Sequence, residues 1–161
     1  MTTTITGAGF AASQLTGALP AIDGSSLTGA RSRATASAQT TTNRTITYST
    51  NWTAHQSISI TTANIDNVRM SFTAASGYES GNVQAEFRFK CGSVYSDTMS
   101  LWNQFSSNKG YGSHGGVWEF SNISVGVVAC EVQVRNIGSG SSIIMNNWDT
   151  EADTFMVNYA N

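Results

Sequence analysis

The chain has 161 residues with 8 Lys and Arg against 10 Asp and Glu, and only 11% of its residues are charged. A net charge of −2 provides no basic face to neutralise phosphates, which argues against a nucleic-acid-binding protein. Seven Phe, five Tyr and four Trp argue against disorder along the whole chain. The longest apolar run, residues 125–130, is too short to span a bilayer, so we expect no membrane insertion.

Residues 1–30 are predicted to form an extended arm. The string Leu-Thr-Gly-Ala occurs at 15–18 and again at 27–30, and the large apolar residues of this stretch follow neither a helical nor a strand period. Pro20, the only proline, and several glycines argue against a helix. So few apolar groups cannot form a core within one chain, so the arm is expected to self-associate with other copies. The first ten residues lack the features of a signal peptide, which predicts synthesis in a cytoplasm.

The arm also resembles a known class of segment. Residues 15–30, LTGALPAIDGSSLTGA, are similar to the LPAxDGSxLTG segments of bacteriophage tail-fibre and other virion surface proteins. The resemblance covers roughly residues 5–30 and implies a trimeric stalk or a particle-anchoring arm. It therefore implies a homotrimer and contacts with other virion proteins of the tail, baseplate or capsid. The residues expected to make these contacts are Leu15, Leu19, Pro20, Ile22 and Leu27.

The remainder of the chain is predicted to be a Ser/Thr/Ala-rich linker or collar, residues 31–45, followed by a β head, residues 46–161. The linker contains no large apolar residue. In the head, apolar and polar residues alternate most clearly in 82–91 and 127–135, where the odd and the even positions respectively face inward. Shorter alternating segments occur at 45–49, 57–61, 68–73, 116–120, 142–146 and 154–159. About eight short strands with turn-rich connections predict an all-β fold, an antiparallel β-sandwich or jelly roll.

The two cysteines, Cys91 and Cys130, fall on inward faces of the two clearest strands and are expected to lie near one another. In a protein made in a cytoplasm such a pair is more typical of buried thiols than of a disulfide. Neither His55 nor His114 has metal-ligand spacing to a cysteine, so no metal and no cofactor are predicted.

Four side chains are candidate receptor contacts. The glycine-rich stretch 108–116 is predicted to be a loop that displays Tyr111 and His114. Trp52 and Trp148 lie among turn residues, where exposed indole rings would stack on a host surface glycan. The alternatives are an ordinary surface loop for the first pair and packing between subunits for the second.

No catalytic residues are predicted. Glu86 and Glu131 fall on outward strand faces, and the series Asp149, Glu151 and Asp153 lacks the glycine and the distal glutamate of an EF-hand loop. The sequence therefore predicts a bacteriophage virion structural protein, a homotrimeric short tail fibre with a β knob for host attachment. The alternatives are a capsid decoration knob that stabilises the head shell and a polysaccharide-degrading tail component, which would need two carboxylates facing one another in a cleft.

Overall fold

The computed structural model describes residues 33–62, 66–78, 81–106, 110–139, 142–145 and 152–160, which belong to one compact unit, Arg31–Asn161. The predicted arm, with Leu15, Leu19, Pro20, Ile22 and Leu27, lies outside the described residues. Within the described ranges no helix has the length and apolar character needed to cross a membrane.

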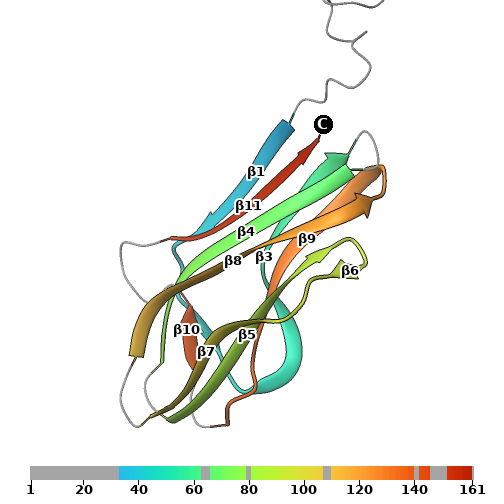
Figure 1. Cartoon of the computed structure of the whole chain (residues 1–161). Helices are drawn as coiled ribbons and strands as arrows, with labels where there is room; N and C mark the ends of the chain where they lie inside the picture. The colour runs from blue at the N-terminus through green and yellow to red at the C-terminus, as the bar shows by residue number, and fades with distance from the viewer. Residues whose placement is uncertain are drawn as a thin grey trace, which may run out of the picture. The chain divides into compact units, whose positions relative to one another are not determined.

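All regular structure in the described ranges is β-strand (Figure 1). The strands are β1 Arg33–Thr40, β2 Arg44–Ile46, β3 Ser49–Thr62, β4 Asp66–Tyr78, β5 Gly81–Cys91, β6 Val94–Tyr95, β7 Met99–Ser106, β8 Gly110–Ile123, β9 Gly126–Asn136, β10 Ile143–Met145 and β11 Asp153–Ala160.

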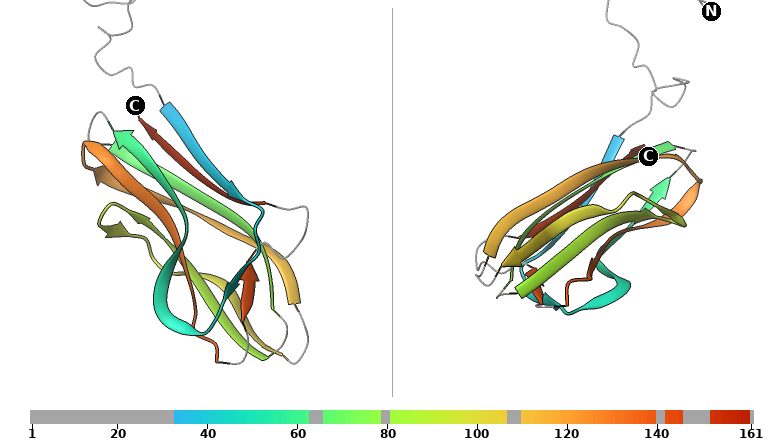
Figure 2. Two further views of the ribbon diagram at one scale, coloured as in Figure 1. Left: turned by 180° about the vertical axis from the view of Figure 1, so that it is seen from behind. Right: turned by 60° about the horizontal axis from the view of Figure 1, so that its bottom comes forward.

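The strands form two antiparallel sheets (Figures 1 and 2). In the first sheet β4 is central: β8 pairs along one of its edges, and β11 and then β10 pair along the other, with β1 beside β11 and β2 beside β10. The second sheet has the order β3-β9-β5, with β7 and β6 on the free edge of β5. The long strands thus follow the orders β1-β11-β4-β8 and β3-β9-β5-β7, a jelly-roll-like arrangement of two Greek keys.

The core lies between the two sheets and confirms the predicted strand faces. Val83, Ala85, Phe87, Phe89 and Cys91 of β5 are all at most 1% exposed. From the opposite sheet, Phe72 approaches Phe87 with ring centroids 5.7 Å apart, and Phe155 stacks on Phe89 at 6.2 Å. Such aromatic contacts across the sandwich join the two layers.

The predicted linker at residues 31–45 is wrong, because most of it belongs to the sandwich. All eight residues of β1 pair with β11, from Arg33 opposite Ala160 to Thr40 opposite Asp153. Ala34, Ala36 and Ala38 are half-buried while the residues between them are exposed. The inward face of the edge strand β1 therefore consists of alanine methyl groups. A strand can thus form an inward face without any large apolar residue.

In the strand predicted at 45–49 the alternating apolar residues are Ile46 and Tyr48, and only Ile46 faces inward. Ile46 is buried, but β2 ends there, and Tyr48 is 58% exposed. The single strand predicted at 45–49 is in fact the end of β2 and the beginning of β3.

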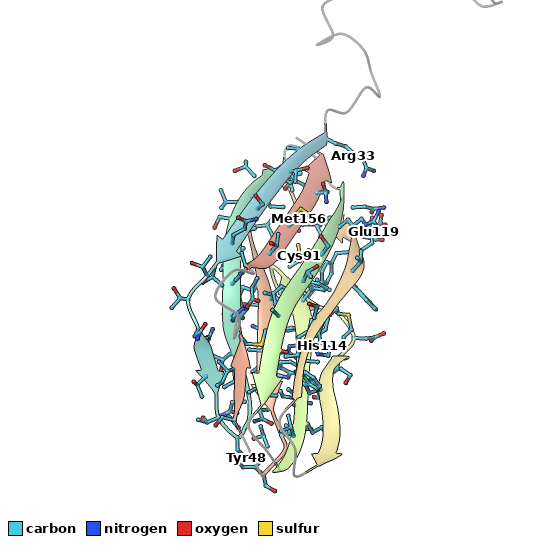
Figure 3. All side chains as sticks on the ribbon, turned by 90° about the vertical axis from the view of Figure 1, so that its left-hand side faces the viewer. Arg33, Tyr48, Cys91, His114, Glu119 and Met156 are labelled. Atoms are coloured by element: carbon cyan, nitrogen blue, oxygen red, sulfur yellow. The ribbon has the colours of Figure 1, made fainter. Side chains whose placement is uncertain are left out.

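The chain enters and leaves the sandwich at one end. Arg33, the first residue of β1, pairs with Ala160, the last residue of β11. Tyr48 lies at the opposite end (Figure 3). The end near Arg33 is where β4 begins and β8 finishes, and the far end is where β4 finishes and β8 begins.

Candidate functional site

The outward face of the second sheet carries a row of charged residues on two neighbouring strands. Outward residues of β5 lie directly opposite outward residues of β9, in the pairs 86 with 135, 88 with 133 and 90 with 131. The position of Glu86 and Glu131 on this face was predicted from the alternation. Each of them forms a salt bridge with a basic residue of the neighbouring strand.

Two of the three cross-strand pairs are ionic. Arg135 donates from Nε and Nη2 to Oε2 of Glu86, each at 2.7 Å, and Lys90 Nζ donates to Oε1 of Glu131 at 3.0 Å. In the third pair Nε of Arg88 donates to Oε1 of Gln133 at 2.9 Å. Arg88 therefore faces a neutral amide, and no carboxylate pairs with it in the part of the chain that the structure describes.

Two aromatic rings complete this cluster. Trp52 lies half-buried on β3, where the ladder to β9 is interrupted between Ser49 and Thr53. The guanidinium carbons of Arg88 and Arg135 each lie 4.4 Å from the Trp52 ring centroid, and that of Arg88 lies 4.1 Å from the ring of Tyr95. We call Trp52, Arg88, Tyr95 and Arg135 the aromatic–arginine cluster. Its contacts are within the range of cation–π interactions.

The surroundings of Arg88 change its pKa but not its charge. Burial lowers the pKa of its guanidinium, the nearby Tyr95 raises it, and the like charge of Arg135 lowers it. An arginine stays protonated at any physiological pH in spite of such shifts. The cluster therefore holds a permanent, partly desolvated cation with no carboxylate beside it.

The glycine-rich stretch is not a loop, which corrects the prediction for residues 110–116. These residues form the first half of β8, and each pairs with a residue of β4, from Gly110 opposite Tyr78 to Gly116 opposite Phe72. A Cβ on Gly115 would lie 2.4 Å from the carbonyl oxygen of Phe72. A Cβ on Gly116 would lie 2.8 Å from Sδ of Met99 and 2.9 Å from Cζ of Phe87. Close packing, and not loop mobility, accounts for these two glycines.

His114 is not displayed on a tip, contrary to the prediction. Its ring is half-buried and lies 4.4 Å from the Trp102 ring, centroid to centroid, and Trp102 in turn donates to Oγ of Ser76 at 2.6 Å. Burial lowers the pKa of His114. Its buried Nε2 has no hydrogen-bond partner in the described part of the chain. The position of His114 along β8 is visible in Figure 3.

The other three candidate receptor contacts are Tyr111, Trp148 and Trp52. The backbone of Tyr111 belongs to β8 and pairs with Gly77, but its side chain lies outside the described residues, as does all of Trp148. Trp52 lies on an outer sheet face, as part of the aromatic–arginine cluster. The strand alternation assigned residues 86, 88 and 90 to an outward face, but it gave no register against β9 and β3, so the cluster itself was not predicted.

A second polar group lies inside the sandwich. Nε2 of His55 and Oδ2 of Asp153 are 2.7 Å apart, and their side chains are 1% and 0% exposed. Oδ1 of Asp153 accepts the backbone N–H of Ala75 at 3.1 Å, and Gln56 Nε2 donates to the Asp153 carbonyl at 2.9 Å. This group ties β3 of the second sheet to β4 and β11 of the first. Because the His55 and Asp153 side chains are buried, a large ligand cannot contact them.

The cysteines lie near one another, as the strand faces predicted, and the register places them directly opposite each other. Cys91 pairs with Cys130 across β5 and β9, and their Sγ atoms are 3.9 Å apart. Both are free, buried thiols. The hydrogen bond to Cys91, together with burial, raises the pKa of the Cys130 thiol, so this sulfur is held in its unreactive protonated form.

A surface hollow of about 280 Å³ lies beside these thiols, between the β5–β6 and β8–β9 turns. Its rim includes the exposed Val94, Val125 and Val127, and no ionisable side chain other than that of Cys91 lines it. In the described ranges no group of three or more His, Cys, Asp or Glu residues is placed to hold a metal ion.

No family model matches the chain, and no curated protein sequence matches it. Among solved structures it is similar to the infectious bursal disease virus VP2 subviral particle, with 8% identity and a TM-score of 0.41 over 80% of this chain and 37% of that one. Structures of the Gx and Gt strains of that virus give 8% and 9% identity and TM-scores of 0.41 and 0.39. They cover 81% and 83% of this chain and 40% and 38% of theirs. The chain thus spans well under half the length of these viral proteins.

Proposed function

We propose that the chain is a bacteriophage virion structural protein, a homotrimeric short tail fibre whose β head contacts the host surface. The observation that carries this proposal is the meeting of β1 and β11 at one end of the sandwich, where Arg33 pairs with Ala160. A head that the chain enters and leaves at one end can be attached there and present its far end and outer faces outward. The resemblance of residues 15–30 to virion arm segments supplies the class of protein.

The head would act by binding and not by turnover. On the outer face of the second sheet, Glu86 of β5 and Glu131 of β9 are each paired with a cation of the neighbouring strand. The His55–Asp153 pair, whose residue types would suit acid–base chemistry, is 1% and 0% exposed. Incubation of the protein with host polysaccharide, followed by chromatography, should therefore release no fragments. Release of oligosaccharides would favour the polysaccharide-degrading alternative.

The location in the particle is tested by copy number. Quantitative mass spectrometry of purified virions should give tens of copies per particle for a tail fibre. Hundreds of copies would identify a head decoration protein and overturn the fibre proposal. The two arrangements differ in their attachment sites on the particle and not in the fold of the head.

The oligomeric state is tested independently. Light scattering of the intact chain at micromolar concentration should give about three times the chain mass of 17.1 kDa. A chain without residues 1–30 should no longer incorporate into particles. A stable monomer of the intact chain would contradict the trimeric stalk, and normal incorporation of the shortened chain would place the attachment surface on the head.

A further inference from the structure

The paired outward residues of β5 and β9 have one positive charge in excess. They include three cations, Arg88, Lys90 and Arg135, and two carboxylates, Glu86 and Glu131. Lys90 and Arg135 each neutralise one carboxylate. The remaining charge belongs to Arg88, whose guanidinium contacts both aromatic rings of the cluster.

The guanidinium of Arg88 is oriented before any ligand arrives. Its Nε donates to Gln133 at 2.9 Å, and its guanidinium carbon lies 4.4 Å from the ring centroid of Trp52 and 4.1 Å from that of Tyr95. Its two terminal nitrogens donate to no described residue. A carboxylate accepts two parallel hydrogen bonds from such a fork. Because the side chain is already ordered, little further rotamer freedom is lost on binding.

We propose that Arg88, flanked by Trp52 and Tyr95, is a binding site for the carboxylate of an acidic sugar in a host surface polysaccharide. The inference deepens the proposed attachment role and rests on it for the biological source of the sugar. Arg88 forms the ion pair with the sugar carboxylate. Tyr95, which is 47% exposed, and the accessible part of Trp52 contact the apolar C–H face of the ring.

The charge pattern favours a sugar carboxylate over a polyphosphate. A nucleic acid or polyphosphate needs several unpaired cations along its length, and the paired outward rows of β5 and β9 offer one. The whole chain is also negative, with a net charge of −2. An isolated carboxylate on a pyranose ring matches a single guanidinium with two aromatic rings beside it. Burial lowers the pKa of Arg88, and a bound anion would return part of the lost solvation.

The test is a calorimetric titration of the purified full-length chain with oligomers of galacturonic, glucuronic and mannuronic acid. The same oligomers after methyl esterification keep the rings and lose the charges, and a sulfated neutral oligosaccharide supplies the other common anion. At least one of the acidic oligomers should bind, and its methyl ester should bind about tenfold or more weakly. Tighter binding of the sulfated oligosaccharide would overturn the assignment to a carboxylate.

Two variants assign the binding to this site. Arg88→Gln removes the charge and keeps a hydrogen-bonding partner for Gln133, so affinity for the acidic oligomer should fall about tenfold or more. Arg69→Gln is the matched control, because Arg69 is an exposed arginine on β4 of the other sheet. Its affinity should equal that of the unaltered chain. Both variants should melt like the unaltered chain.

Equal losses in the two variants would show a non-specific charge effect and overturn the proposal. It would also be overturned if none of the acidic oligomers bound at millimolar concentration. Because the titration uses the purified chain, a negative result would not affect the separate test of the tail-fibre proposal by copy number per virion. The two proposals can therefore fail separately.

Discussion

The two polar groups of this head use the same chemistry in opposite surroundings. The His55–Asp153 pair inside the sandwich has a nitrogen–oxygen distance of 2.7 Å and side chains 1% and 0% exposed. On the outer face, Arg135 and Glu86 are equally close at 2.7 Å, with side chains 26% and 18% exposed. Distance alone does not rank these pairs, because water can solvate the outer pair when it is broken and cannot solvate the inner one.

The two groups also differ in what they connect. The outer pairs join β5 to β9, two strands that already share a backbone ladder. The inner group joins the two sheets through the side chain and carbonyl of Asp153, which contact His55 and Gln56 of β3 and the N–H of Ala75 in β4. We therefore expect the inner group to determine stability and the outer cluster to determine binding.

The largest loss of stability is expected for Asp153→Ala. The change leaves His55 and the backbone N–H of Ala75 buried without their acceptor, so the free energy of unfolding should fall by about 3–5 kcal/mol. Chemical denaturation at neutral pH measures it. Asp97→Ala, which removes an exposed carboxylate, is the control and should change stability by less than about 0.5 kcal/mol. A similar small loss for Asp153→Ala would show that burial does not distinguish the two groups.

The next largest loss of stability is expected for a substitution in the glycine-rich first half of β8. Gly115→Ala would place a Cβ 2.4 Å from the carbonyl oxygen of Phe72, so β8 and β4 must separate locally. Overpacking of this kind costs about 1–3 kcal/mol, which thermal unfolding would reveal. Ser113→Ala, at an exposed position of the same strand, should be nearly neutral. Equal melting temperatures for the two variants would restore the interpretation of this stretch as a pliable segment.

The sequence predicted the parts of the fold that large alternating side chains determine. In β5 and β9 every second residue is apolar, and both strands and their faces were placed correctly. The strand β1 was missed because its inward side chains are alanines, which also occur in linkers. The glycines of β8 suggested a loop, since their packing partners Phe72, Met99 and Phe87 lie far away in the sequence.

The inner polar group was not predictable from alternation. Gln56 and Ile60 face inward at even positions of β3, which would place His55 on the outer face. The register to β9 shifts between Ala54 and Gln56, and this irregularity brings two successive side chains inside. The aromatic–arginine cluster required a similar knowledge of register, because Trp52, Arg88 and Arg135 come from three different strands.

A smaller effect is expected for Glu131→Gln on the outer face. The change removes the ion pair with Lys90, whose side chain is 25% exposed, so the loss of stability at neutral pH should be below about 1 kcal/mol. Burial raises the pKa of Glu131, but hydrogen bonds from Gln133 and Lys90 outweigh it and leave the pKa below the ordinary 4.5. The stabilisation by Glu131 is thus present above pH 4.5 and lost as the pH falls through the lowered pKa. Melting curves of both proteins should converge in acid, and a constant difference would contradict this linkage.

The smallest effect on stability is expected for His114, whose half-buried ring packs against Trp102. Burial lowers its pKa from the ordinary 6.5, so the unfolded chain takes up a proton before the folded chain does. Stability should therefore be unaffected by this residue above pH 6.5 and should decline as the pH falls from there towards the lowered pKa. His114→Gln removes this proton uptake, and its melting temperature should fall less steeply below pH 6.5 than that of the unaltered chain. Parallel slopes would mean that His114 is solvated when protonated, as an exposed receptor contact would be, and that its packing against Trp102 is not maintained in solution.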